Sequence, residues 1–275
     1  MSDSPPAFDL AAYCTRIGFT GPAAPTVETL HAVVGRHAAT IPFENLDVLL
    51  GRPIPLDAES LQRKLIRDKR GGYCFEQNGL LLLALGALGF QVTPIGARVR
   101  WQIARDVIPA RTHLFARVDL DGVAWLADVG LGGASLTSAI QLDSDAEQAT
   151  PHEPRRILRE NGRLYHQSRL GDEWHDVCEF TLDEMHPIDR ELANWWTSAS
   201  PQSHFKKRLI VARAGAGGTR LSIRDREFTI RQADGRAETR PVESPGQLIE
   251  LCAQHFGLDF PAGTRFGPPG SPWPS

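Results

Sequence analysis

The sequence RTHLFARVDLDGVAWLADVG, residues 111–130, predicts a β-hairpin. Two apolar segments of alternating character meet at the dipeptide Asp121-Gly122, which is favoured in two-residue hairpin turns. In that arrangement Leu120 pairs with Val123, and the ladder runs outward from the turn. This register determines which residues face each other at the open end of the hairpin, far from the turn.

The open end of this hairpin brings together a histidine and a carboxylate. Side chains alternate along a strand, so His113 and Asp128 project from one face as diagonal neighbours, with Asp128 facing Phe115. A four-residue turn, residues 119–122, would put them directly opposite each other and preserve the contact. Asp128 follows an apolar run, where an unpaired carboxylate is costly. We therefore expect His113 to be its partner, either in a structural pair or in a catalytic site.

A candidate nucleophile lies upstream in the sequence RGGYCFEQN, residues 70–78. Cys74 follows a double glycine at the start of an expected helix, where free amide groups stabilise a thiolate and can stabilise an oxyanion. With His113 and Asp128 it completes the three parts of a thiol triad. An ordinary buried thiol is one alternative. A zinc site made of the same three side chains is another, although it needs a fourth ligand.

The first ninety residues predict three helices and hence a small bundle. One begins after the N-cap Thr26, with apolar residues at helical spacing. A second begins after Asp57 and runs through a basic stretch until Gly71-Gly72 stops it. The third begins near Cys74 and contains the apolar run 79–90, which is too short to cross a bilayer.

After residue 90 the pattern predicts an antiparallel sheet or barrel and then a smaller α/β segment. The expected strands cover residues 92–101, 113–120, 123–129, the runs beside Asn161-Gly162, 208–214 and 221–230, and helices cover 187–197 and the segment from Ser244 to about His255. The last ten residues, FGPPGSPWPS, are too rich in proline and glycine for regular structure. We expect three domains, residues 1–90, 91–200 and 201–275.

Composition narrows the class of protein. The chain has 275 residues, enough for a sizeable core, and a formal net charge of −3, which does not favour nucleic acid or an anionic membrane as a partner. Its four cysteines are scattered and predict free thiols rather than disulfides or a zinc knuckle. The N-terminus lacks the basic and apolar parts of a secretory signal, so we expect a cytoplasmic protein.

Four motifs, in order, resemble the arylamine N-acetyltransferase family, whose bacterial members are also called N-hydroxyarylamine O-acetyltransferases. The motifs are HAATIPFENL (37–46), RGGYCFEQN (70–78), THL (112–114) and ADVGLGG (127–133). The resemblance implies an α+β fold with an N-terminal helical bundle, a central antiparallel β-barrel and a C-terminal α/β lid around a cysteine-protease-like catalytic core. It also implies that Cys74 is the acetylated nucleophile, His113 its base and Asp128 the residue that orients the histidine.

The same resemblance implies the substrates. Acetyl-CoA is the expected co-substrate, an aromatic amine, hydrazine or N-hydroxyarylamine the acceptor, and the cycle is ping-pong without a metal. Residues expected to contact coenzyme A, where glycines allow main-chain approach to a pyrophosphate, are Thr112, Gly130, Gly132 and Gly133. Candidates for an aromatic acceptor pocket are Phe43, Tyr73 and Phe205. The glycine loop can also be a plain turn, and the three rings can be plain core.

Two other functions remain open. A thiol hydrolase or a transglutaminase-like amidase uses the same triad with water or another amine as acceptor. A catalytically silent binding module could keep the fold. The intact set of Cys74, His113 and Asp128 argues against a silent module.

Overall fold

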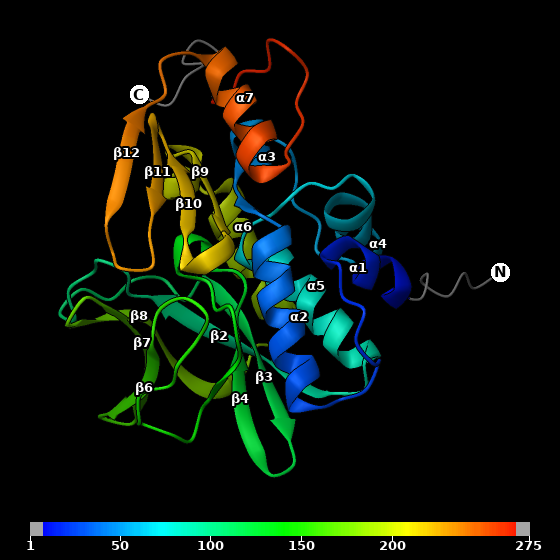
Figure 1. The fold of residues 1–275 in the computed structure, drawn as a ribbon, viewed down its shortest axis with the longest axis vertical. Coiled ribbons are helices and arrows are strands. Elements are labelled where there is room, and N and C mark those ends of the chain that lie inside the picture. The colour runs from blue at the N-terminus through cyan, green and yellow to red at the C-terminus, as the bar shows by residue number, and fades with distance from the viewer. Residues whose placement is uncertain (1–7, 268–275) are drawn as a thin grey trace.

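The computed structural model describes residues 8–267 and has the α+β architecture that the sequence predicted. Helices gather beside a seven-stranded antiparallel sheet, and a five-stranded antiparallel sheet lies at one end of the molecule (Figure 1). The helices are α1 (Leu10–Ile17), α2 (Val27–Thr40), α3 (Leu46–Leu49), α4 (Ala58–Gln62), α5 (Cys74–Ala87), α6 (Pro187–Ala199) and α7 (Pro245–Phe256). The strands are β1 (Phe43–Glu44), β2 (Gln91–Val99), β3 (His113–Leu120), β4 (Val123–Ala127), β5 (Ile140–Gln141), β6 (Arg155–Glu160), β7 (Arg163–Leu170), β8 (Glu173–Glu184), β9 (Ile210–Ala214), β10 (Arg220–Arg224), β11 (Glu227–Arg231) and β12 (Ala237–Pro241).

The predicted helix starts are confirmed at both ends of the chain. The side-chain oxygen of Thr26 accepts a hydrogen bond from the N–H of Thr29, so α2 begins at the next residue. Helix α5 begins at Cys74 and contains most of the apolar run, which packs into the main core together with β3 and β4. Ser244 caps α7 by accepting from the N–H of Gln247.

The predicted end of the second helix is wrong. Helix α4 continues into a π-helical turn (Arg63–Arg67) that ends at Asp68, ahead of the double glycine, and Lys69 takes a left-handed backbone with φ 52°. The glycines serve a different purpose. A Cβ on Gly71 would lie 2.0 Å from the carbonyl oxygen of Pro42, so only glycine lets the two segments come this close.

The predicted hairpin forms with the predicted register. Leu120 pairs with Val123, and the ladder continues to Ala116 and Ala127. Asp121 and Gly122 have φ of 49° and 78°, the pair of left-handed residues that a two-residue type I′ turn requires. The alternative four-residue turn is therefore excluded.

The expected barrel is a nearly closed seven-stranded sheet with strand order β5-β4-β3-β2-β8-β7-β6. Gln148 joins its two edges. Its backbone forms an antiparallel bridge with Arg155 on β6, and its side chain exchanges two hydrogen bonds with the backbone of Gln141 on β5. The sheet curves around so that β3 and β4 remain against the helices (Figure 1).

Six of the helices and strands were not predicted, namely α1, α3, β1, β5, β8 and β12. Helices α1 and α3 have 8 and 4 residues, and β1 has two, so none is long enough to show a clear apolar period. Strand β1 still matters for the fold, because Phe43 pairs with Ala212 and adds the N-terminal region to the sheet β1-β9-β10-β11-β12. Within residues 8–267 no helix is both long and apolar enough to cross a membrane. The proline- and glycine-rich tail lies outside the described residues from position 268 onward.

Candidate active site

The histidine and the carboxylate at the open end of the hairpin are in direct contact. His113 is the first residue of β3, and Asp128 directly follows β4. The Nε2 of His113 lies 2.7 Å from an oxygen of Asp128, and both side chains are buried. The pairing that the sequence predicted is therefore present in the structure.

Cys74 joins this pair from the start of α5. Its Sγ lies 3.5 Å from the carbonyl oxygen of Thr112, the residue before His113, and its side chain interacts with the imidazole and raises the pKa of that ring. Since Nε2 of His113 is bound to Asp128, Nδ1 is the ring nitrogen left for the sulfur. Cys74 is 5% exposed, so its side chain is largely buried. The three predicted triad residues are thus brought together from one helix and one hairpin.

The electrostatics of the pair favour an imidazolium beside a carboxylate. Burial alone would lower the pKa of His113, but Asp128 and the Cys74 side chain outweigh burial and raise it to about 10. Burial would raise the pKa of Asp128, but His113, the N–H of Gly130 and Asn78 together lower it below its usual range. At neutral pH His113 is therefore protonated in the resting site.

The other cysteines differ from Cys74 in their surroundings. Burial raises the pKa of Cys14 and Cys178, and it raises that of Cys252 to about 12. Cys178 does lie 3.9 Å from the Nδ1 of His166, but burial lowers the pKa of that imidazole to about 3 and keeps it neutral. Of the four thiols, Cys74 is the one beside an imidazolium.

Asn78 is a site residue that the sequence analysis missed. Its side-chain amide donates to an oxygen of Asp128 at 2.9 Å and to the carbonyl of Leu114, and its oxygen accepts from the N–H of Val129 at 3.0 Å. Asn78 lies four residues after Cys74 on α5, which puts it on the same helix face. That spacing was the signal available in the sequence.

Gly130 lets the hairpin approach the helix. A Cβ on this residue would lie 2.7 Å from the Cα of Cys74 and 2.4 Å from the Nδ2 of Asn78. Gly132 takes a left-handed backbone, with φ 59°, beside the ring of Phe43, and Gly133 faces open space. The glycine loop therefore combines one tightly packed position with one open position.

Buried charges hold the turn before Cys74. A carboxylate oxygen of Glu76 accepts from the N–H of Tyr73, and Lys64 binds the other oxygen at 2.6 Å. Arg70 binds Glu44 at 2.6 Å on the same side of the site. Burial raises the pKa of Glu76, and the ammonium of Lys64 opposes that rise. Each charge in this cluster has a partner of opposite sign, so the cluster fixes the backbone at the helix start.

The three predicted aromatic residues form one buried cluster that also contains Cys74. The ring of Phe205 lies 6.1 Å from that of Phe43 and 5.6 Å from that of Tyr73, in edge-on contacts. All three belong to the same buried cluster as Cys74. Tyr73 also donates its hydroxyl hydrogen to Asn194 on α6. The rings are thus core residues that share a buried cluster with Cys74.

A chain of buried hydrogen bonds ends at the backbone next to Phe43, one of the three aromatic residues. The hydroxyl of Tyr13 bonds the Nδ1 of His37 at 2.9 Å, and the Nε2 of His37 bonds the amide oxygen of Gln77 at 2.6 Å. Gln77 then donates to the carbonyl of Pro42 at 2.7 Å, next to Phe43. Burial lowers the pKa of His37 to about 4, so this histidine is neutral and fixes a segment of backbone.

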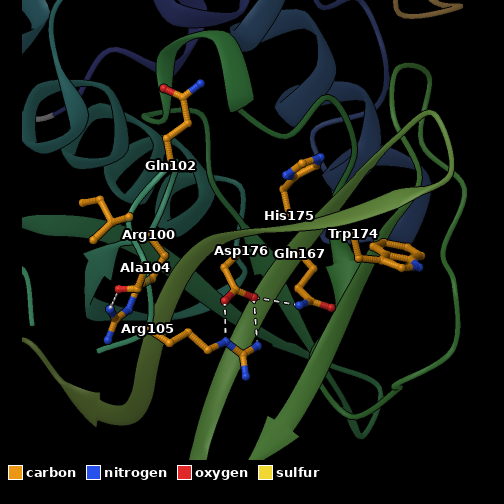
Figure 2. A pocket seen from close by; sticks show the side chains of 9 residues that line it. Arg100, Gln102, Ala104, Arg105, Gln167, Trp174, His175 and Asp176 are labelled. Carbon is orange, nitrogen blue, oxygen red and sulfur yellow. Dashed lines mark hydrogen bonds and ion pairs between the residues drawn. The ribbon is translucent and has the colours of Figure 1, made fainter. Parts of the chain in front are cut away.

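A separate surface pocket of about 440 Å³ is lined by residues from the loop after β2 and from β7 and β8 (Figure 2). Both arginines that line it have carboxylate partners, and that of Arg100 is Glu179. Arg105 pairs with Asp176 at 2.7 Å, and Gln167 bonds the same carboxylate (Figure 2). None of the triad residues lines it. Among residues 8–267, no group of three or more His, Cys, Asp or Glu side chains is placed to hold a metal ion.

A thiol, an imidazole and a carboxylate in contact define a class of enzyme, one that can use a cysteine to attack an acyl group. Comparison with known proteins places the chain within this class. A sequence model of the N-acetyltransferase family matches residues 26–264. The arylamine N-acetyltransferase of Mycolicibacterium smegmatis is 40% identical over 258 residues, which cover 92% of this chain and 93% of that protein. The arylamine N-acetyltransferase / N-hydroxyarylamine O-acetyltransferase of Salmonella typhimurium is 38% identical over 249 residues, which cover 90% and 88%.

Solved structures agree with the sequence relatives. The arylamine N-acetyltransferase from Salmonella typhimurium matches with a TM-score of 0.86 at 38% identity, over 90% of each chain. The Mycobacterium marinum arylamine N-acetyltransferase in complex with CoA matches with a TM-score of 0.87 at 34% identity, over 91% of this chain and 93% of that chain. The chain belongs to the arylamine N-acetyltransferase family, which confirms the resemblance found in its motifs.

Proposed function

We propose that this protein transfers an acetyl group from acetyl-CoA to an aromatic amine, hydrazine or N-hydroxyarylamine through an acetyl-cysteine at Cys74. The observation that carries the proposal is the contact of Cys74 with the buried His113–Asp128 pair. The names of the relatives support the acceptor class, and the Mycobacterium marinum complex supports coenzyme A.

In the first half-reaction the Cys74 thiolate attacks the thioester carbonyl carbon of acetyl-CoA. The N–H of Cys74, at the free N-terminus of α5, donates to the resulting oxyanion. The bond between the carbonyl carbon and the sulfur of coenzyme A then breaks. The imidazolium of His113 gives its proton to the departing thiolate, which leaves as coenzyme A.

In the second half-reaction the neutral His113 acts as the base. An amine nitrogen attacks the carbonyl carbon of acetyl-Cys74, and His113 accepts the proton that the nitrogen loses. The carbon–sulfur bond to Cys74 breaks and restores the thiolate, which again lies beside an imidazolium. Asp128 orients the ring throughout and stabilises its protonated form.

The proposed coenzyme A contacts come from Thr112 and the loop after β4. Gly133 faces open space and Gly132 has a left-handed backbone, which supports main-chain approach to a phosphate group. The carbonyl of Thr112 lies at the Cys74 sulfur, where the thioester must arrive. For Gly130 we infer an indirect role in coenzyme A binding. Its close packing against Cys74 brings the glycine loop near the sulfur.

The proposed acceptor site is the aromatic cluster of Phe43, Tyr73 and Phe205. Flat aromatic amines can stack on aromatic rings or contact them edge-on. These three rings share a buried cluster with Cys74. The chain from Tyr13 through His37 to Pro42 supports the position of Phe43.

We further propose the finer organisation that the family resemblance implies. Residues 1–90 form a helical bundle that carries the nucleophile, residues 91–200 a barrel that carries His113 and Asp128, and residues 201–275 an α/β lid, around a cysteine-protease-like core. This division is supported by the position of Cys74 at the start of α5, of His113 on β3 and of Asp128 directly after β4. A cytoplasmic location, and the absence of nucleic-acid and membrane partners, stay predictions.

Steady-state kinetics test the proposed cycle. Reciprocal plots of rate against amine at several acetyl-CoA concentrations should be parallel, because coenzyme A leaves before the amine binds. Intersecting lines would show direct transfer in a ternary complex. Release of coenzyme A at equal rates with and without amine would favour the thiol hydrolase, since water would then be the acceptor.

A further inference from the structure

The hydroxyl of Ser135 closes the loop that follows β4. It accepts a hydrogen bond from the N–H of Leu131 at 2.9 Å and donates one to the carbonyl of Val129 at 3.0 Å. Ser135 is 4% exposed, so the protein itself supplies the partners of these polar groups. The hydroxyl therefore holds the backbone on both sides of Gly130.

The hydrogen bonds of the glycine loop, residues 129–133, leave two donors free. The first three N–H groups of the loop donate to the side chains of Asn78, Asp128 and Ser135. The N–H groups of Gly132 and Gly133 have no acceptor within residues 8–267. In the proposed function, these two N–H groups are the main-chain donors that the loop offers to a phosphate oxygen of coenzyme A.

We propose that Ser135 is a positioning residue for the acyl donor. Its hydroxyl fixes the backbone of the glycine loop and thereby holds the two free N–H groups in one arrangement before coenzyme A arrives. Ser135 itself contacts none of the reacting atoms in the proposed cycle. This inference rests on the proposed function and adds to it a residue that determines the affinity for acyl-coenzyme A.

The physical reason is the cost of leaving backbone groups without partners. If the hydroxyl is removed, the N–H of Leu131 and the carbonyl of Val129 lose their hydrogen bonds, and the loop has to rearrange to satisfy them. Gly132 follows Leu131 directly, so its N–H moves with the rearranged backbone. A loop that is already ordered in the free protein binds more tightly than one that must be ordered by the ligand.

The end of the loop near the thiol has supports of its own. The N–H of Gly130 donates to a carboxylate oxygen of Asp128 at 3.0 Å, and the carbonyl of Asp128 accepts from the N–H of Leu136 at 2.8 Å. The Cα of Gly130 also packs closely against Cys74. These contacts do not involve the hydroxyl of Ser135, so its loss should change the binding of coenzyme A and spare the triad.

Single-turnover acetylation of Cys74 by two donors tests the inference. Acetyl-CoA carries phosphate groups, whereas p-nitrophenyl acetate carries none, and the released coenzyme A or p-nitrophenolate reports the rate. In Ser135→Ala the acetyl-CoA concentration that gives half the maximal rate should rise by about 10-fold, because two backbone groups lose their partner. The maximal rate and the rate with p-nitrophenyl acetate should stay at the wild-type level, since only donor binding is weakened.

Ser138→Ala is the matched control. Ser138 follows the same loop, but its hydroxyl hydrogen-bonds the Nδ1 of His31 on α2 at 2.9 Å instead of the loop backbone. This variant should match the wild type with both donors. Ser135→Cys keeps a similar volume and weakens both hydrogen bonds, so it should shift the acetyl-CoA concentration in the same direction. It decides the question if circular dichroism shows that Ser135→Ala does not fold.

Two results overturn the inference. One is a folded variant of Ser135 with the wild-type dependence on acetyl-CoA. The other is an equal loss of rate with both donors, which would make the hydroxyl a support of the thiol site and not of coenzyme A binding. A wild-type chain that acetyl-CoA does not acetylate would overturn the proposed function as well, so the two failures are distinguishable.

Discussion

The two oxygens of Asp128 have different partners. One accepts from His113, and the other accepts from Asn78 at 2.9 Å and from the N–H of Gly130 at 3.0 Å. The charge of this carboxylate keeps a proton on His113, because burial alone would lower the pKa of the imidazole. A substitution that keeps the shape of Asp128 but removes its charge can therefore separate the two contributions.

Asp128→Asn should reduce the rate of Cys74 acetylation by roughly 10²–10⁴-fold, because the amide keeps the shape but cannot stabilise the imidazolium. In the wild type the imidazolium is lost only as the pH rises through about 10. In the variant the pKa of His113 falls, so the alkaline loss of rate should move to lower pH. Single-turnover release of coenzyme A, measured from about pH 6 to about pH 10, gives both quantities.

Circular dichroism must accompany this measurement, because breaking a buried ion pair also destabilises the fold. A folded Asp128→Asn variant with a wild-type rate and an unshifted pH profile would mean that the pair is structural.

The approach of Cys74, His113 and Asp128 to one another could be predicted because each residue had a local signal. Cys74 follows a double glycine at a helix start, and the Asp121-Gly122 turn fixes the register that joins His113 to Asp128. Asn78 could not be predicted with the same ease. Its acceptor Asp128 is 50 residues away, and an amide inside a helix gives no sign of its partner.

At the scale of elements, the site depends on how closely the end of β4 approaches the start of α5. Gly130 stands at that approach, with its Cα facing Cys74 and Asn78. Substitutions that add volume to a packed position force the backbone to move. The distance between hairpin and helix is therefore sensitive to a single methyl group.

Gly130→Ala should destabilise the protein by about 1–3 kcal/mol and lower the rate of acetyl transfer, because the added Cβ meets backbone atoms of Cys74. Gly86→Ala on α5 is the control. A Cβ there meets nothing within 4 Å, so the variant should be as stable as the wild type or more stable by about 0.5–1 kcal/mol. Urea unfolding and an arylamine assay supply the comparison. Wild-type stability and rate in Gly130→Ala would show that the approach is not tight.

Most of the predicted elements have a recognisable cap or turn signal, whereas α1, α3, β1, β5, β12 and the 12-residue strand β8 were not predicted. Helix α2 has its Thr26 cap and the hairpin has its turn, whereas β1 has two residues and is defined by pairing with β9 far along the chain. The predicted stop at Gly71-Gly72 was wrong because the helix ends before it, at Asp68, and Lys69 takes a left-handed backbone.

At the scale of the whole molecule, a buried ion cluster joins the two sheets. Glu153, just before β6, binds Arg155 on β6 at 3.0 Å and Arg220 on β10 and Arg231 on β11 at 2.6 Å each. Burial would raise the pKa of Glu153, but the three guanidinium groups lower it far below its usual range. The cluster thus links the seven-stranded sheet, which carries His113, to the five-stranded sheet, which contains Phe43.

Glu153→Gln should lower the free energy of unfolding at pH 7 by roughly 3–5 kcal/mol, because it leaves buried guanidinium groups without their counter-charge. The folded-state pKa of Glu153 is depressed, so its stabilising effect is present above the unfolded value of about 4.3 and is lost as the pH falls further. The difference between variant and wild type should therefore shrink in acid. Thermal unfolding of both proteins at about pH 7 and about pH 3 measures this difference in stability. An equal difference at the two pH values would contradict the stabilising role of the Glu153 carboxylate.

Intact-protein mass spectrometry after mixing with acetyl-CoA, in the absence of any amine, tests the central claim most directly. The wild-type chain should gain one acetyl group, peptide mapping should place it on Cys74, and addition of an arylamine should remove it with formation of the acetylated amine. Cys74→Ser, folded by circular dichroism, should not form this intermediate at a comparable rate. An unmodified wild-type chain that still acetylates the amine, or an acetyl group carried by another residue, would contradict the account.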